Sequence, residues 1–170
     1  MHSRMPNSLL AGVYTLTLIS FANSQSAWAG ATTDGSVGPV VSYGTDFGTP
    51  NFTIPDSVGS TLNNNLFHSF NNFSINAGES ATFTGPGAIN NVITRVTGGD
   101  ISTLNGPLRS SRPTANVYFM NPKGIIFKEG ATISVDGSFY ATTSNYIRFG
   151  QDGYFYADLT APPLTTAPPS

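Results

Sequence analysis

Beyond residue 29, apolar and polar side chains alternate in short runs. The segments 72–75, 81–84 and 132–135 each place every second residue on one face, as Ile133 and Val135 do in the last of them. Alternation of period two, with β-branched and aromatic residues at the apolar positions, is typical of strands. No segment after residue 29 has a helical pattern, so the sequence predicts an all-β fold.

Glycine-containing pairs and triplets separate these runs. They are Gly85-Pro86-Gly87, Gly98-Gly99, Asn105-Gly106, Lys123-Gly124, Glu129-Gly130, Asp136-Gly137 and Asp152-Gly153. Such residues accept a positive φ at little steric cost, as tight turns require. We therefore expect turns at these positions, and positive φ as the reason for the glycines.

The apolar pattern leaves two β architectures open. Phe119, Ile126, Ile133 and Tyr140 recur at intervals of seven residues with turns between them, so three strand-plus-turn units span about 21 residues. That length suits one turn of a parallel β-helix, in which each turn covers the interior of its neighbour. Asn-Gly and Asp-Gly turns also suit the hairpins of a β-sandwich.

The two ends of the chain differ from the alternating part. A short basic region with Arg4 is followed by an apolar stretch over 9–22, and then by Ala27-Trp28-Ala29. This is the pattern of a cleaved signal peptide, and the apolar stretch is shorter than the roughly 20 residues of a membrane-spanning helix. We predict a signal peptide over 1–29, with Ala27 and Ala29 before the cut and Gly30 after it. Residues 160–170 are rich in Pro and Thr and are expected to form a disordered tail.

Charged residues make up only 9% of the 170 residues, the net charge is −2, and cysteine is absent. Nucleic-acid and anionic-membrane partners need clustered Lys and Arg, so neither is expected. Stability must come from packing and backbone hydrogen bonds, since no disulfide can form.

Apolar residues within 32–60 are expected to form cap strands over one end of the fold; they are Val40, Val41, Phe47, Phe52 and Ile54.

Candidate catalytic chemistry is sparse. Asp100, Glu129 and Asp136 lie in separate turns without the paired spacing of hydrolases and lyases, and His68 has no companion at metal-ligand spacing. We therefore predict no enzyme activity, no catalytic or metal site and no cofactor, and a partly buried His68. Seven phenylalanines are assigned to the core, namely Phe67, Phe70, Phe73, Phe83, Phe119, Phe127 and Phe139. The asparagines at 63–65 and 71–72 are candidates for stacked amide ladders, with ordinary loop positions as the alternative.

Several segments resemble a known family and occur in its order. They are NLFHSFNNFSI (65–75), NVITRVTGG (91–99), ISTLNG (101–106), ANVYFMNPKGIIF (115–127) and GSFYATT (137–143). Together they resemble the haemagglutination-activity domain of filamentous-haemagglutinin-like, two-partner secretion exoproteins. The resemblance covers roughly residues 63–144. Lys123 stands where the family usually has a second Asn, and a further family motif, Asn-Pro-Asn-Leu, has no clear counterpart.

The resemblance implies a right-handed parallel β-helix over residues 30–159, with an N-terminal β cap and short extra-helical hairpins. It implies a secretion domain that reaches the cell surface through the periplasm, is recognised by a cognate outer-membrane β-barrel transporter and nucleates β-helix folding. We expect a monomer, with host-cell or polysaccharide contacts left to a C-terminal passenger.

Recognition by the transporter is predicted to involve Asn121, Pro122, Lys123, Gly124 and Ile125, although the first four also suit a plain reverse turn between core strands. The alternative function is a stand-alone secreted adhesin or carbohydrate-binding β-helix. The sequence does not choose the passenger's biological task.

Overall fold

A computed structural model describes residues 30–86, 88–151 and 153–160, and nearly all of its regular structure is strand. The strands are β1 (Ala31–Thr33), β2 (Ser42–Tyr43), β3 (Asn51–Ile54), β4 (Ser60–Leu62), β5 (Asn65–Phe73), β6 (Ser80–Phe83), β7 (Asn91–Val96), β8 (Ser102–Leu104), β9 (Pro107–Ser110), β10 (Asn116–Met120), β11 (Ile125–Phe127), β12 (Thr132–Ser134), β13 (Phe139–Thr142), β14 (Tyr146–Phe149) and β15 (Gly153–Tyr156). Two single-turn 3₁₀ helices, η1 (Thr45–Phe47) and η2 (Asp56–Val58), join the early strands.

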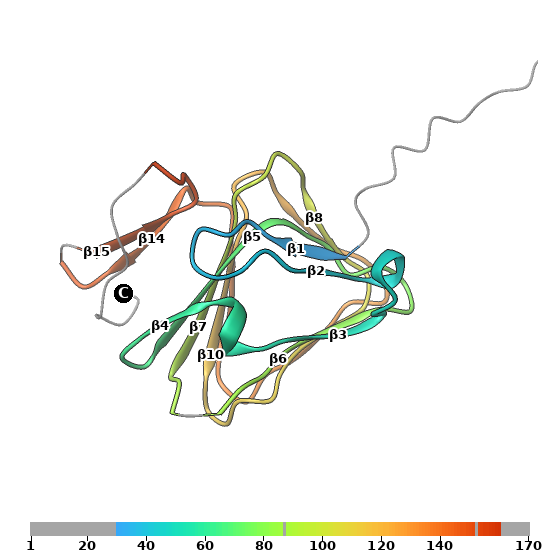
Figure 1. The fold of residues 1–170 in the computed structure, drawn as a ribbon, viewed down its shortest axis with the longest axis horizontal. Helices are drawn as coiled ribbons and strands as arrows, with labels where there is room; N and C mark the ends of the chain where they lie inside the picture. Colours follow the sequence, from blue (N-terminus) through green and yellow to red (C-terminus); the bar gives the residue numbers. More distant parts are fainter. Residues whose placement is uncertain (1–29, 87, 152, 161–170) are drawn as a thin grey trace, which may run out of the picture.

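The strands stack into three parallel sheets around one interior (Figure 1). Sheet 1 has the order β13-β10-β7-β5, sheet 2 has the order β12-β9-β6-β3, and sheet 3 pairs β11 with β8. The solenoid has about four turns, and from β7 onward the chain visits sheet 1, sheet 3 and sheet 2 in rotation. The all-β prediction and the right-handed parallel β-helix are confirmed, and the sandwich alternative is excluded because the core pairings are parallel.

The turns of the solenoid are not of one length. Asn65 lies opposite Asn91, 26 residues later, and Asn91 lies opposite Asn116, 25 residues later. The following step, from Asn116 to Ser138, is 22 residues. Only this last turn approaches the length that the sequence predicted.

The seven-residue spacing identifies strands but not faces. Phe119, Ile126, Ile133 and Tyr140 fall in β10, β11, β12 and β13 in order. Phe119 lies in the interior, whereas Tyr140 points outward and stacks on Tyr118, with ring centroids 4.6 Å apart. The predicted strand-plus-turn units are therefore present, but the four residues do not share one facing, because corners of unequal length reset the alternation.

The interior is filled mainly by phenylalanine. Phe73 makes edge-to-face contacts with Phe70 and Phe119, each with ring centroids 5.0 Å apart. Phe83 is also fully buried there, so the predicted aromatic core is largely confirmed. Phe127 differs, because it is 47% exposed at the end of the solenoid.

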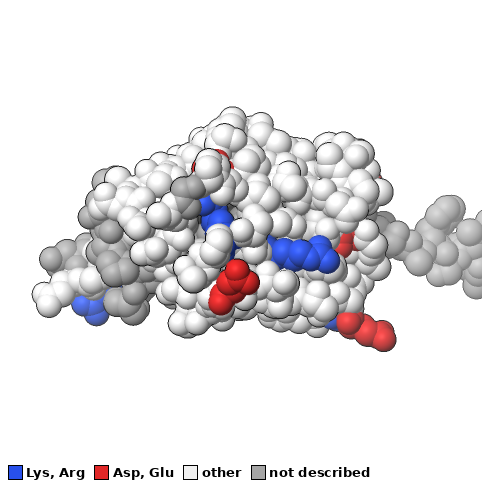
Figure 2. All heavy atoms as spheres, turned by 90° about the horizontal axis from the view of Figure 1, so that it is seen from below, with Lys and Arg blue, Asp and Glu red and all other residues white. Residues whose placement is uncertain are grey.

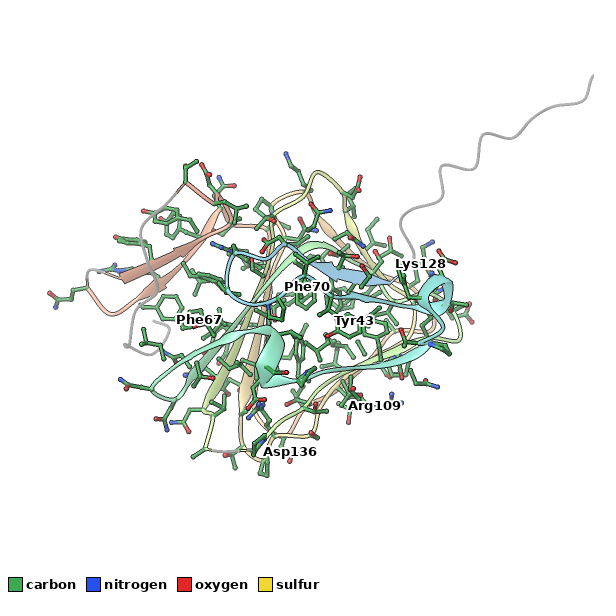
Figure 3. All side chains as sticks on the ribbon, in the orientation of Figure 1. Tyr43, Phe67, Phe70, Arg109, Lys128 and Asp136 are labelled. Atoms are coloured by element: carbon green, nitrogen blue, oxygen red, sulfur yellow. The ribbon has the colours of Figure 1, made fainter. Side chains whose placement is uncertain are left out.

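A second apolar cluster lies outside sheet 1. Phe67 points away from the interior that Phe70 enters (Figure 3). The antiparallel hairpin β14–β15 covers this outer side with Ile147, Phe149 and Phe155 (Figure 1). A hairpin outside the helix is what the family resemblance implied.

The N-terminal strands close one end of the solenoid. β1 pairs antiparallel with β5 and β2, and Tyr43 stacks on Phe52 at 5.5 Å. The expected cap is present but is built differently. Val40 and Phe47 are 67% and 51% exposed, and β3, which holds Phe52, joins the parallel stack of sheet 2.

In the described part of the chain, no helix has the length and apolar character needed to cross a membrane.

Gly85 and Gly124 have the predicted positive φ, but four other corner glycines have a different role from the one predicted. Gly98, Gly106, Gly130 and Gly137 lie between strands as expected, but none of them has a positive φ. A Cβ atom at these positions would lie 2.0, 2.2, 2.5 and 2.5 Å from a backbone oxygen of the preceding turn. Glycine is needed there because stacked corners approach too closely for any side chain.

Candidate functional site

The predicted recognition residues form the corner between sheet 1 and sheet 3, where β10 ends and β11 begins. The Gly124 N–H donates to the Asn121 carbonyl at 3.1 Å, which closes a reverse turn with Pro122 at its second position. Gly124 has φ of 128°, a conformation that only glycine adopts readily. The plain structural interpretation of this motif is therefore satisfied.

Asn121 is completely buried and fastens three consecutive turns of the solenoid. Its side-chain amide donates to the Asp100 carbonyl at 3.0 Å and to the Ser102 hydroxyl at 2.9 Å in the turn before. Its backbone N–H donates to the Thr142 carbonyl in the turn after, at 3.0 Å. Its side-chain oxygen accepts the Lys123 N–H at 2.9 Å, which fixes the turn. Asn121 thus holds the corner in place and is out of reach of a partner of the folded domain.

The remaining residues of the motif differ in accessibility. Lys123 is exposed, and Pro122 and Ile125 are half-buried, with Ile125 packed against the core. Pro122 and Lys123 border a hollow of about 170 Å³. The lining of the hollow also includes Asn145 and Asp158, which flank the hairpin and had no sequence signal of their own. The accessible part of the motif is therefore centred on Lys123.

The outer side of sheet 1 carries a polar network that the sequence did not reveal. The Asp34 carboxylate accepts hydrogen bonds from the hydroxyls of Ser36, Ser69 and Thr97, the last two at 2.5 and 2.8 Å. Burial alone would raise the pKa of Asp34, but these hydrogen bonds outweigh burial and lower the pKa. The ionised carboxylate thus joins the segment after β1 to β5 and to the end of β7.

Arg95 extends the network to the hairpin. Its guanidinium donates to the hydroxyls of Ser69 and Ser36 and to the Tyr156 carbonyl, and it lies over the Phe155 ring, 4.4 Å from the centroid. Burial lowers the pKa of Arg95, and the charge of Asp34 opposes this change. A single side chain therefore connects the N-terminal segment, sheet 1 and the C-terminal hairpin.

An amide ladder is present, in part where it was predicted. The Asn91 amide donates to the Asn65 side-chain oxygen at 2.9 Å, and the Asn116 amide donates to that of Asn91 at 3.2 Å. The Ser138 N–H continues the series to the Asn116 oxygen at 2.9 Å. Of the predicted asparagines Asn65 takes part, whereas Asn72 donates to the Gly30 carbonyl in the cap.

His68 is wholly buried, which corrects the prediction of a partly exposed residue. It packs between Phe70 and Phe83 on the interior side of β5. Burial, with a further contribution from the charge of Arg112, lowers its pKa to about 3. The imidazole is therefore neutral at physiological pH.

No group of three or more His, Cys, Asp or Glu residues in the described segments could hold a metal ion. Asp100, Glu129 and Asp136 lie in three different corners of the solenoid. On the face shown in Figure 2, positive and negative side chains are few and scattered. This distribution agrees with the low charge content of the sequence.

The predicted processing site lies at the edge of the described residues. Ala27 and Ala29 are outside them, as is the predicted tail from residue 161 onward. Gly30 is the first residue described, and it is buried directly before β1.

The geometry defines a parallel β-helix with a closed N-terminal end, an Asn-Pro corner and an outer hairpin that Arg95 joins to sheet 1. The sequence model of the TPS (two-partner secretion) secretion domain matches residues 29–168, and the chain belongs to this family. It is 36% identical over 84 residues to a heme/hemopexin-binding protein of Haemophilus influenzae. The match covers 49% of this chain and 9% of that protein, and no solved structure matches. The chain therefore carries the secretion domain of two-partner secretion substrates.

Proposed function

We propose that residues 30–159 are the segment by which the periplasmic domains of the cognate transporter select this chain, and that after export the segment nucleates β-helix folding. In this proposal the domain crosses the periplasm in an unfolded form and has no catalytic role. Its low charge, 9% of residues, and its lack of cysteine favour a chain that stays extended while it passes through a pore.

The difference between the two ends of the solenoid carries this proposal. At the N-terminal end, β1, β2 and Tyr43 cover the interior. At the other end, Phe127 and Ile133 are 47% and 37% exposed, although each pairs in register with a completely buried leucine of the previous turn. A β-helix turn is stable only when a neighbour covers its apolar interior. The closed end and the open end together favour growth in one direction, from this domain toward the C-terminus.

The burial pattern of the recognition motif guides the test of selection. A transporter that binds the folded domain can contact the exposed Lys123 but not the buried Asn121, whereas a transporter that binds the unfolded chain can contact both residues. Removing the buried Asn121 amide leaves the Asp100 carbonyl and the Ser102 hydroxyl short of a partner, at a cost of about 1–3 kcal/mol. Lys123→Ala removes an exposed side chain and should change the free energy of unfolding by less than about 0.5 kcal/mol.

Secretion of residues 1–170 should be measured in cells with and without the candidate transporter, for the parent chain and for Asn121→Ala, Lys123→Ala and Gly124→Val. We expect transporter-dependent export that Asn121→Ala and Gly124→Val reduce, with urea unfolding of each purified variant as the stability control. Loss of export in Lys123→Ala at unchanged stability would assign direct contact to the exposed lysine. A parent chain that folds and stays in the periplasm with either transporter genotype would refute selection by the transporter.

One observation favours the second candidate function, a carbohydrate-binding module. A shallow groove of about 610 Å³ crosses the stacked corners between sheet 3 and sheet 2, and its lining includes Asn51, Ser80, Asn105, Arg109 and Glu129. Arg109 points outward from sheet 2 (Figure 3). Neutral and acidic polysaccharides should be titrated against the domain and against Arg109→Ala, with Arg148→Ala on the hairpin as the control. Saturable binding that only Arg109→Ala weakens would favour this function, and absence of binding would remove it.

A further inference from the structure

The corner between β8 and β9 contains the only Asn-Gly pair of the 170 residues, Asn105 and Gly106. Glycine after asparagine favours loss of the side-chain amide, because it has no Cβ to shield its backbone nitrogen and adopts the conformation of the cyclic product at little cost. The pair also borders the shallow groove between sheet 3 and sheet 2, whose lining includes Glu79 and Glu129. Conversion of Asn105 to a carboxylate would add a negative charge to this groove.

The turns before and after the corner hold Asn105 from both sides. Its backbone N–H donates to the Ile75 carbonyl of the turn before at 2.7 Å. Its side-chain oxygen accepts the Gly130 N–H of the turn after at 3.1 Å. A Cβ atom on Gly130 would lie 2.5 Å from the Asn105 carbonyl oxygen. The stacked corners therefore fix both the backbone and the side chain of Asn105.

The main chain after Asn105 has no room for an extra atom. Gly106 is buried, and a Cβ atom on it would lie 2.2 Å from the Glu79 carbonyl oxygen. Pro107 follows at once and begins β9, which pairs in parallel with β6 and β12. One more carbon between Asn105 and Gly106 would push Gly106 toward the Glu79 carbonyl or move β9 out of register with its neighbours.

We propose that the Asn105 amide is a site of spontaneous deamidation in the unfolded chain, that folding protects it, and that its isoaspartyl product prevents this corner from stacking. The Gly106 nitrogen loses its proton to solvent base and attacks Asn105 Cγ. The new C–N bond closes a cyclic imide, while the bond from Cγ to the side-chain nitrogen breaks and ammonia leaves. Water then opens the imide at Cγ, which gives an aspartyl residue, or at the backbone carbonyl carbon, which gives an isoaspartyl residue.

Ring closure requires a movement that the folded corner opposes. Asn105 Cγ must rotate onto the Gly106 nitrogen, which takes the side-chain oxygen away from the Gly130 N–H. The folded domain therefore reacts through the fraction of molecules in which the corner has opened.

The two products differ in their fit to the folded corner. The aspartyl form keeps the main chain and an oxygen for the Gly130 N–H, whereas the isoaspartyl form carries the extra main-chain carbon. A chain that stays unfolded thus loses its ability to fold with time, whichever transporter exports it.

The first arm of the test compares the folded parent, residues 1–170, with Phe119→Asp in one mildly alkaline buffer. The variant is unfolded by a charge at a completely buried position, and the urea-unfolded parent gives a second unfolded reference. Mass-spectrometric peptide mapping follows the Asn105 amide, and labelling by isoaspartyl methyltransferase follows the isoaspartyl product. We expect Asn105 to react in both unfolded samples and at least about tenfold more slowly in the folded parent. Asn116 precedes the β-branched Val117 and should keep its amide throughout.

The second arm measures refolding after incubation in urea. The yield of the parent should fall as its isoaspartyl content rises, and the refolded fraction should be depleted of that product. Freshly prepared Asn105→Asp should refold like the fresh parent, which separates the added charge from the longer main chain. Asn105→Gln keeps an amide but closes the ring poorly, so incubation should not lower its yield.

Three results overturn the proposal. They are modification of the folded parent at the unfolded rate, isoaspartyl chains that refold as well as unmodified ones, and an Asn105 amide that survives in both unfolded samples. Failure of Asn105→Asp to refold would overturn the assignment to the longer main chain, because charge alone would then account for the loss. None of these results bears on selection by the transporter.

Discussion

At the scale of single residues, the corners of the solenoid depend on close backbone approach. Gly98 and Gly99 are adjacent, yet a Cβ on Gly98 would lie 2.0 Å from the Asn71 carbonyl oxygen, whereas one on Gly99 would meet nothing within 4 Å. Neither has a positive φ. Substitutions at these two glycines therefore distinguish the effect of a steric clash between turns from the effect of backbone conformation.

We predict that Gly98→Ala destabilises the domain by about 2–3 kcal/mol, because two stacked turns must move apart to admit the methyl group. Gly99→Ala should be neutral or stabilise by up to about 1 kcal/mol, through the reduced entropy of the unfolded chain. Urea unfolding of both variants measures the difference. Equal effects of the two substitutions would show that close contact is not what the corner requires.

His68 supplies a pH dependence at the same scale. Its pKa is about 3 in the folded domain and about 6.5 in the unfolded chain, so the unfolded chain binds the proton more tightly. Stability is therefore complete above pH 6.5 and falls as the pH drops from 6.5 toward 3. From pH 7 to pH 5 this residue should remove about 2 kcal/mol.

The matched variant is His68→Leu, which keeps an apolar side chain of similar size in the interior. Its free energy of unfolding should fall less than that of the parent between pH 7 and pH 5, by the same 2 kcal/mol or so. Parallel pH curves for the two proteins would mean that His68 does not control this loss. Other titrating groups contribute equally to both chains, so the comparison isolates the histidine.

At the scale of elements, the hairpin β14–β15 depends on one buried cation. Arg95 donates to the Tyr156 carbonyl and lies over Phe155, while Asp34 and Ser69 hold the network beneath it. We predict that Arg95→Ala loosens the hairpin by about 2 kcal/mol, through the loss of the charged hydrogen bonds and the ring contact.

Hydrogen exchange measured residue by residue gives the sharpest readout for this prediction. Amides of 146–156 should exchange faster in Arg95→Ala, while those of β7 and β10 next to the interior keep most of their protection. Arg148→Ala, an exposed arginine on the same hairpin, should leave both regions unchanged. Uniformly faster exchange would show that Arg95 supports the whole domain and not the hairpin in particular.

The strands of the solenoid show which features of the fold could be predicted from the sequence and which could not. Alternation located the strands, because side-chain period depends on neighbouring residues alone. Register did not follow, since Asn65 meets Asn91 only through corners whose lengths no local pattern sets. The network of Asp34 with Ser69 and Arg95 joins residues 26 to 35 positions apart, and single polar residues in strands carry no signal of such pairing. The buried role of Asn121 was likewise visible only once Asp100 and Thr142 lay on either side of it.

At the scale of the molecule, the solenoid has one closed and one open end, and β11 offers a matched pair of residues to test this. Phe127 is 47% exposed and pairs in register with the buried Leu104, so it belongs to the interior row. Ile126 is 46% exposed and pairs with Thr103 on the outer row. The two neighbours are equally accessible in this domain, yet only Phe127 would be covered by a further turn.

We predict that the free energies of unfolding of Phe127→Ser and Ile126→Ser in residues 30–160 differ from each other by less than about 1 kcal/mol, since each substitution removes a half-exposed side chain. In a chain that carries further β-helix turns after this domain, Phe127→Ser should slow refolding and reduce the protease-resistant product, because a polar hydroxyl then faces the new interior. Ile126→Ser should refold like the parent. Stopped-flow refolding with limited proteolysis measures both, and identical behaviour of the two variants in the longer chain would mean that growth does not start from this end.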